Sequence, residues 1–215
     1  MADARFSAED FQRRVRDRLA VDPGDPVGDH TFNPDIAEMF EGIERRAAAV
    51  LVPIIHREPE ATILLTRRTE GLSNHAGQIA FPGGRIDPED EDAVAAALRE
   101  AEEEVGLSRQ YVETLCLAPE YFTASGFRVA TVIAIVKPGF TLVPNPAEVD
   151  SVFEVPLSFL MDPANHRRNS RVWQGVTRYF FEMPYQERYI WGITAGILRI
   201  LYERLYHDQP ESVAS

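Results

Sequence analysis

Short apolar runs alternate with polar turns along this chain of 215 residues, and the pattern predicts most of its strands. The runs at 48–55 and 61–68 are rich in β-branched residues and flank a polar turn, so we expect two strands that can pair as a hairpin. The other expected strands are 112–117, 127–136 and 151–155, with further strand pieces within 172–181 and 186–191. The polar, basic segment 162–171 is expected to be a loop.

Helices are expected at both ends of the chain. Phe11, Val15 and Leu19 have helical spacing, and Ser7 with an acidic residue three positions later is typical of a helix start, which predicts a helix over 7–20. We expect this helix to pack on the core or on a second subunit of a homodimer. The other expected segments are a Pro- and Gly-rich linker at 21–35, a short helix at about 34–44 and a last helix at 192–205.

A central helix is predicted from residues typical of a helix start and a helix end. Asp87-Pro88 is typical of a helix start, and Gly106 is typical of a helix end because glycine readily adopts the left-handed conformation. At about 100° per residue the apolar side chains gather on one side of this helix and three acidic ones on the other. The apolar set is Val94, Leu98, Ala101 and Val105, and the acidic set is Glu100, Glu103 and Glu104.

Like charges at this spacing repel one another, so the acidic cluster needs something to offset the repulsion. A hard divalent cation such as Mg²⁺ or Mn²⁺ does so, because both ions prefer carboxylate oxygens. The alternative is a solvated acidic helix face without a ligand. Arg99 beside the cluster and the glycine turn Gly83-Gly84 ahead of the helix favour a site, since glycine lets the backbone approach a ligand closely.

Composition limits the class of protein. The chain is 45% hydrophobic and 26% charged, with a formal net charge of −12, which argues against general binding to nucleic acids or to a membrane surface. No apolar run reaches membrane-spanning length, and no signal or transit peptide is evident. The single cysteine, Cys116, excludes an intrachain disulfide and is expected to be a small buried hydrophobic group. We therefore expect a cytoplasmic protein. Predicted strands precede and follow one central helix, with another helix at the end, which predicts an α/β fold with a mixed sheet.

The stretch from Gly84 to Leu107 resembles the Nudix box, G-x5-E-x7-R-E-U-x-E-E-x-G-U, with one extra residue, so that the first acidic position of the box falls on Asp90 or Glu91. The resemblance implies an α/β/α sandwich, which we place at 46–207. The residue pattern adds an N-terminal helix and a Pro- and Gly-rich linker at 1–45 and a disordered tail at 208–215. The resemblance also implies that water hydrolyses the diphosphate of a nucleoside diphosphate linked to another moiety, with Mg²⁺ or Mn²⁺ as cofactor. The implied metal ligands are Glu100, Glu103, Glu104 and the carbonyl of Gly83, with Arg99 orienting a carboxylate and either a box glutamate or Glu148 as the base.

Two segments outside the box resemble the coenzyme A pyrophosphatase subgroup of the Nudix family: LLTRR at 64–68 and the stretch from 72 to FPGG at 81–84. Ser73 stands where that subgroup has an arginine. The segments 125–127, 152–157 and 191–195 resemble it as well. The resemblance implies hydrolysis of coenzyme A or acyl-CoA to 3′,5′-ADP and 4′-phosphopantetheine or its acyl derivative. ADP-ribose or another nucleoside diphosphate derivative is the alternative substrate, and a Nudix-fold binding module without turnover is the alternative of another class.

An anionic substrate in an acidic protein requires local cations, and arginine suits phosphate because its planar fork donates two parallel hydrogen bonds. The candidate substrate-binding residues are Arg67, Arg68, His75, Arg85 and Arg128, together with Arg167, Arg168 and Arg171 of the basic segment. Phe122 and Phe127 are candidates for covering an adenine ring, with core packing as the alternative.

Overall fold

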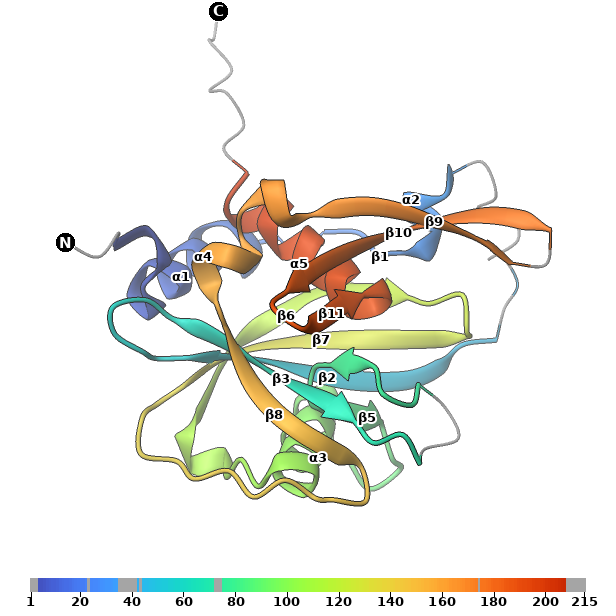
Figure 1. Ribbon diagram of the computed structural model, residues 1–215. Helices are drawn as coiled ribbons and strands as arrows, with labels where there is room; N and C mark the ends of the chain where they lie inside the picture. Colours follow the sequence, from blue (N-terminus) through green and yellow to red (C-terminus); the bar gives the residue numbers. More distant parts are fainter. Residues whose placement is uncertain are drawn as a thin grey trace, which may run out of the picture.

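The computed structural model describes residues 4–22, 24–34, 42, 44–71, 75–173 and 175–207, and it contains two β-sheets with helices on both faces of the larger one (Figure 1). The strands are β1 (Val27–Gly28), β2 (Arg46–Ile55), β3 (Thr62–Arg68), β4 (Ile79–Ala80), β5 (Gly83–Arg85), β6 (Val112–Phe122), β7 (Phe127–Val136), β8 (Val149–Pro156), β9 (Arg167–Trp173), β10 (Val176–Tyr185) and β11 (Arg188–Trp191). The helices are α1 (Ala8–Arg14), α2 (Asp29–Phe32), α3 (Ala93–Val105), α4 (Leu157–Leu160) and α5 (Gly192–Leu205), with short helical turns at η1 (Ala4–Phe6), η2 (Val15–Leu19), η4 (Arg109–Tyr111) and η5 (Pro163–Asn165).

The larger sheet is mixed, as the sequence predicts. Its strand order is β1-β6-β7-β2-β3-β4, while β5 pairs with β2 and β8 pairs with β3. β2 runs parallel to β7 along its whole length, and β1 runs parallel to β6. β2 and β3 do pair as a hairpin, but only through two residue pairs, because β5 takes the next part of the same edge of β2.

Two apolar cores lie on opposite faces of this sheet. One core packs against α3, and the other packs against α1, η2 and α5. Figure 1 shows α3 below the sheet, and α5 with the small three-stranded sheet β11-β10-β9 above it. The layers are therefore helix, sheet and helix, which confirms the predicted α/β/α sandwich.

The N-terminal helix packs on the core of its own chain. α1 begins after Ser7, whose hydroxyl accepts a hydrogen bond from the backbone N–H of Asp10 at 3.1 Å, and its last turn continues as the π-helical turn η2. Phe11 and Leu19 are fully buried. Arg14 also donates to the carbonyl of Leu205 at 3.0 Å, so this helix is tied to the end of α5.

Several segments differ from the sequence-based expectations. The expected linker 21–35 contains β1 and α2. The second half of the expected loop 162–171 belongs to β9, an edge strand that is exposed along its whole length and so lacks the apolar alternation of a buried strand, and the first half contains the helical turn η5. The expected helix at 34–44 and the expected tail at 208–215 fall largely or wholly outside the described residues.

Two smaller expectations concern Cys116 and membrane spans. Cys116 is partly buried, and burial raises the pKa of its thiol to about 11, which suits a packing group better than a nucleophile. In the part of the chain that the structure describes, no helix is long and apolar enough to cross a membrane.

Candidate active site

The helix α3 begins later than its sequence signals indicate. Its N-cap is Asp92, whose side chain accepts a hydrogen bond from the backbone N–H of Ala95 at 2.8 Å. The predicted start at Asp87-Pro88 is wrong, because the Asp90 carboxylate accepts a hydrogen bond from the backbone N–H of Asp87 at 2.9 Å and closes a turn before the helix. The predicted end is confirmed, since Gly106 has the left-handed φ of 69°.

The three glutamates do not share one solvent-facing side of α3. Glu104 is only 2% exposed. It follows Ala101 by about one helical turn and Ala97 by about two, so it lies with them on the face that packs against the sheet. Glu100 is partly buried, whereas the side chain of Glu103 is 57% exposed. The prediction that all three lie opposite the apolar face is therefore wrong for Glu104.

Burial gives Glu104 an unusual charge state. The pKa of the carboxyl is raised to about 7, mainly by burial and also by the nearby carboxylates of Glu100 and Glu148, although a hydrogen bond from the backbone N–H of Gly83 at 3.2 Å lowers it. Arg68 lies 3.3 Å away and compensates the charge only in part. A second cation in this position would stabilise the ionised carboxylates.

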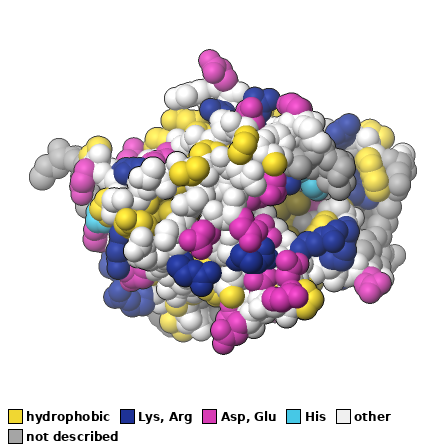
Figure 2. All heavy atoms as spheres, turned by 90° about the horizontal axis from the view of Figure 1, so that it is seen from below, with side chains coloured by type: hydrophobic (Ala, Val, Ile, Leu, Met, Phe, Trp, Pro, Cys, Tyr) yellow, Lys and Arg dark blue, Asp and Glu magenta, His cyan; other side chains and the backbone are white. Residues whose placement is uncertain are grey.

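Arg99 holds the exposed side of the acidic cluster. Its guanidinium donates twice to Asp90, at 3.0 and 2.9 Å, and also to Glu100 at 3.0 Å and to Glu103 at 3.2 Å. The hydrogen bonds from Arg99 lower the pKa of Asp90. Of the two acidic residues that could fill the first acidic position of the box, Asp90 makes these contacts, while Glu91 is exposed. Figure 2, which views the molecule from the side of α3, shows acidic and basic side chains close together on this face.

Gly84 leaves room for one of these carboxylates. A side chain at this position would overlap the carboxylate of Glu100, because β5 passes directly over that part of α3. The glycine turn therefore brings the backbone next to the acidic cluster, as the sequence predicts.

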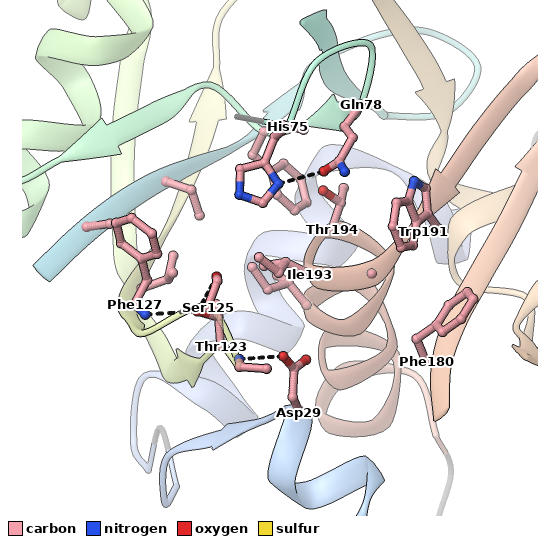
Figure 3. Close-up of a pocket in the computed structure, with 18 of the residues that line it drawn as sticks. Asp29, His75, Gln78, Thr123, Ser125, Phe127, Phe180, Trp191, Ile193 and Thr194 are labelled. Carbon is pink, nitrogen blue, oxygen red and sulfur yellow. Dashed lines mark hydrogen bonds between the residues drawn. The ribbon is translucent and has the colours of Figure 1, made fainter. Parts of the chain in front are cut away.

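A cavity of about 550 Å³ adjoins the same turn on the other face of the sheet. Its walls come from β2, β5, β7, the β9–β10 hairpin, the start of α5 and the segment 29–33. Figure 3 shows Phe127 on one side, Phe180 and Trp191 on the other, and Ile193 of α5 between them. At one end of the cavity His75 donates from Nδ1 to the side-chain oxygen of Gln78 at 2.9 Å.

Residues 45–174 match the NUDIX domain, which is more than half of the chain. The chain belongs to the NUDIX family. Over 160 residues it is 42% identical to the Nudix hydrolase NudL of Photorhabdus laumondii, covering 74% of this chain and 85% of the relative. Over 166 residues it is 39% identical to NudL of Yersinia pestis, covering 77% of this chain and 82% of the relative.

Among solved structures, a Nudix hydrolase from M. smegmatis, RenU, is 28% identical over 53% of this chain and 71% of that one, with a TM-score of 0.45. The predicted Nudix resemblance is confirmed by the family match and by the two relatives. The protein is a Nudix pyrophosphohydrolase that acts on nucleoside diphosphate derivatives.

Nudix hydrolases generally need divalent metal ions, and the donor chemistry of this site suits them. The charge of Glu148 raises the pKa of both Glu100 and Glu104, so these carboxylates lie near one another, and carboxylate oxygens are the ligands that Mg²⁺ and Mn²⁺ prefer. Within the described ranges, no three acidic, histidine or cysteine side chains already stand as a metal cage. Two of these carboxylates instead form ion pairs with arginines: Glu104 pairs with Arg68 and Glu100 pairs with Arg99.

Because Arg99 donates hydrogen bonds to Asp90, Glu100 and Glu103, we expect Arg99→Met to lower kcat by roughly 10- to 100-fold and to weaken the apparent affinity for Mg²⁺. Steady-state rates measured across a Mg²⁺ titration check both effects. Arg109→Met is the matched control, since Arg109 also faces a helix glutamate, Glu102, at 3.9 Å but lies outside the site. A Mg²⁺ dependence that is unchanged in Arg99→Met would contradict the orienting role.

The structure brings only some of the predicted substrate-binding residues to the cavity. Arg68, His75, Arg85, Phe127 and Arg171 line it. Arg67, Arg128, Arg167, Arg168 and Phe122 do not. Arg67 instead pairs with Glu70 at 2.9 Å, and Arg128 pairs with Glu120 at 3.5 Å.

Other cavity residues were not identified from the sequence. They include Asp29, Asn33, Trp173, Arg178, Tyr179 and Phe180, whereas Gln78 and Trp191 lie in segments that resemble the subgroup. Nothing in the sequence indicated that the segment 29–33 belongs to the site, because it lies within a Pro- and Gly-rich stretch typical of a linker. Nothing indicated this for Arg178 either, because it lies within a predicted strand.

Proposed function

We propose that this Nudix hydrolase cleaves the diphosphate of coenzyme A or of an acyl-CoA, giving 3′,5′-ADP and 4′-phosphopantetheine or its acyl derivative. The observation that carries the proposal is the charge of the cavity. Among the described residues that line it there are four arginines and one acidic residue, although the whole protein has a net charge of −12. Such a local reversal of charge favours an anionic ligand with more than one phosphate.

The acidic residue, Asp29, is already engaged by the protein. One carboxylate oxygen accepts a hydrogen bond from the hydroxyl of Tyr121 at 2.9 Å, and the other accepts from the backbone N–H of Ala124 at 2.7 Å. Its charge is therefore directed into the wall, and the cavity surface is cationic and apolar.

Two of the segments that resemble the coenzyme A subgroup, 125–127 and 191–195, contribute residues to this cavity. Ser125 and Phe127 line one side, and Trp191, Ile193 and Thr194 line another. These residues are far from the box in sequence, yet they line the same cavity as its glycine turn. This position supports a role in substrate specificity.

For the reaction itself, we propose that Glu100, Glu103 and Glu104 hold the metal, with the backbone of Gly83 beside them. When bound, Mg²⁺ or Mn²⁺ neutralises charge on the diphosphate and lowers the pKa of a coordinated water. Glu103 is the most exposed of the three and can turn away from Arg99. Glu104 is held in place by Gly83 and Arg68.

The base that takes the proton from water is proposed to be Glu148 or Glu103. Glu148 lies in the turn before β8, where Asn145 donates to its carboxylate at 3.4 Å. Its charge also contributes to the raised pKa of Glu100, which places it near the cluster. Arg99 orients the carboxylates and is not proposed to contact the substrate.

A substrate panel tests the proposed function. With Mg²⁺ present, we expect kcat/KM to be highest for coenzyme A and acyl-CoA, and lower for ADP-ribose, NADH and diadenosine polyphosphates. Product analysis by chromatography should give 3′,5′-ADP. A higher kcat/KM for ADP-ribose would replace the proposal by the alternative substrate class, and tight binding without turnover of any compound would indicate a binding module.

A further inference from the structure

The β9–β10 hairpin carries four arginines whose surroundings differ. Arg167 lies opposite Glu182 in the register of the two strands, and Arg168 donates to the carbonyl of Phe32 at 3.3 Å while its guanidinium covers the Tyr179 ring at 4.1 Å. Neither lines the cavity. These two arginines serve the fold of the hairpin.

The other two, Arg171 and Arg178, are directly opposite each other and both line the cavity. Like charges facing each other across two strands are destabilising. Arg178 covers the ring of Trp173 at 3.9 Å, whereas Arg171 makes no hydrogen bond or ion pair with any residue that the structure describes. This wall therefore presents positive charge to the cavity.

The hairpin is held in place by residues from the N-terminal part of the chain. Asn33, which is 4% exposed, accepts a hydrogen bond from the backbone N–H of Tyr179 at 2.7 Å and donates to the carbonyl of Tyr179 at 3.0 Å. Phe32 packs edge-on against Phe181 with ring centroids 5.0 Å apart. Contacts within the protein itself thus hold the cationic wall in place.

We propose that Arg171, with Arg178 beside it, binds a phosphomonoester on the nucleoside end of the substrate. Arg68 and the glycine turn of the box lie at a different wall, next to the glutamates proposed to hold the metal, so the protein would recognise two separate phosphate groups of one molecule. Guanidinium groups suit this task because they donate paired hydrogen bonds to phosphate oxygens. The identity of the molecule rests on the proposed function: coenzyme A carries such a phosphate on its ribose and retains it in 3′,5′-ADP.

The test compares two nucleotides that differ only in this phosphate, 3′,5′-ADP and 5′-AMP, by titration calorimetry. We expect the wild-type protein to bind 3′,5′-ADP at least roughly tenfold more tightly, since a hydrogen bond to a charged group contributes about that much. Arg171→Gln should remove most of this preference and leave binding of 5′-AMP unchanged. Arg171→Lys should restore part of it, and the control Arg167→Gln should keep it in full.

Equal affinity of the wild-type protein for the two nucleotides would overturn the proposal, as would an equal loss in Arg167→Gln. Turnover of coenzyme A and dephospho-coenzyme A by the same variants separates this proposal from the proposed function. Absence of coenzyme A hydrolysis, with the nucleotide preference lost only in Arg171→Gln, would contradict the proposed function and support the subsite. Equal kcat/KM for both compounds in the wild type would contradict the subsite and support the function.

Discussion

Glu104→Gln is expected to reduce kcat by roughly three orders of magnitude, which corresponds to about 4 kcal/mol of lost transition-state stabilisation. Glu104 is the buried member of the proposed metal-binding set, and glutamine keeps its shape and its hydrogen bond from Gly83 while removing the negative charge. Steady-state kinetics at saturating Mg²⁺ measure the effect. Glu102→Gln is the control on the same helix, because Glu102 is exposed and faces Arg109. Activity within tenfold of the wild type would contradict the role of Glu104.

The same pair of variants reports on the fold in metal-free protein. The pKa of Glu104, at about 7, lies above its ordinary value of 4.5, so the folded state binds more protons than the unfolded state between these values. The free energy of unfolding therefore falls as the pH rises through this window, by up to about 3 kcal/mol. Glu104→Gln should lack this fall and Glu102→Gln should retain it. Denaturant unfolding at pH 5 and pH 8 in the presence of a chelator measures the difference. An equal change in the free energy of unfolding between the two pH values for all three proteins would contradict the raised pKa of Glu104.

Phe11→Ala is expected to lower the free energy of unfolding by about 3–5 kcal/mol, because it leaves a cavity where a fully buried ring had been. For a chain of this size the melting temperature should fall by on the order of 10 °C. Calorimetry or circular dichroism measures the shift.

The matched control is Arg16→Ala on the same N-terminal helix, where the side chain is exposed and we expect a change within about 0.5 kcal/mol. If Phe11→Ala were as stable as Arg16→Ala, then the helix would not form part of the core. A melting temperature that depends on protein concentration would point instead to packing on a second subunit.

Elements with an unambiguous burial pattern were predicted well from the sequence. β7 has the predicted bounds because eight of its ten residues are buried, and α5 has them because its apolar positions follow the helical period. β9 was missed because an exposed edge strand has no burial pattern to detect. The start of α3 was misplaced because two aspartates compete as its cap, and Arg99 holds the segment around Asp90 out of the helix.

The sequence by itself determined the family of this protein and predicted its site residues. The spacing of Arg99, Glu100, Glu103 and Glu104 between glycine signals is local, so it can be read without the fold. Only the tertiary structure decided which cations face the cavity, because that depends on strand register and on contacts between distant residues. Asn33 and Tyr179 are 146 positions apart, yet their hydrogen bonds hold the hairpin that places Arg171 at the cavity and leaves Arg168 outside it.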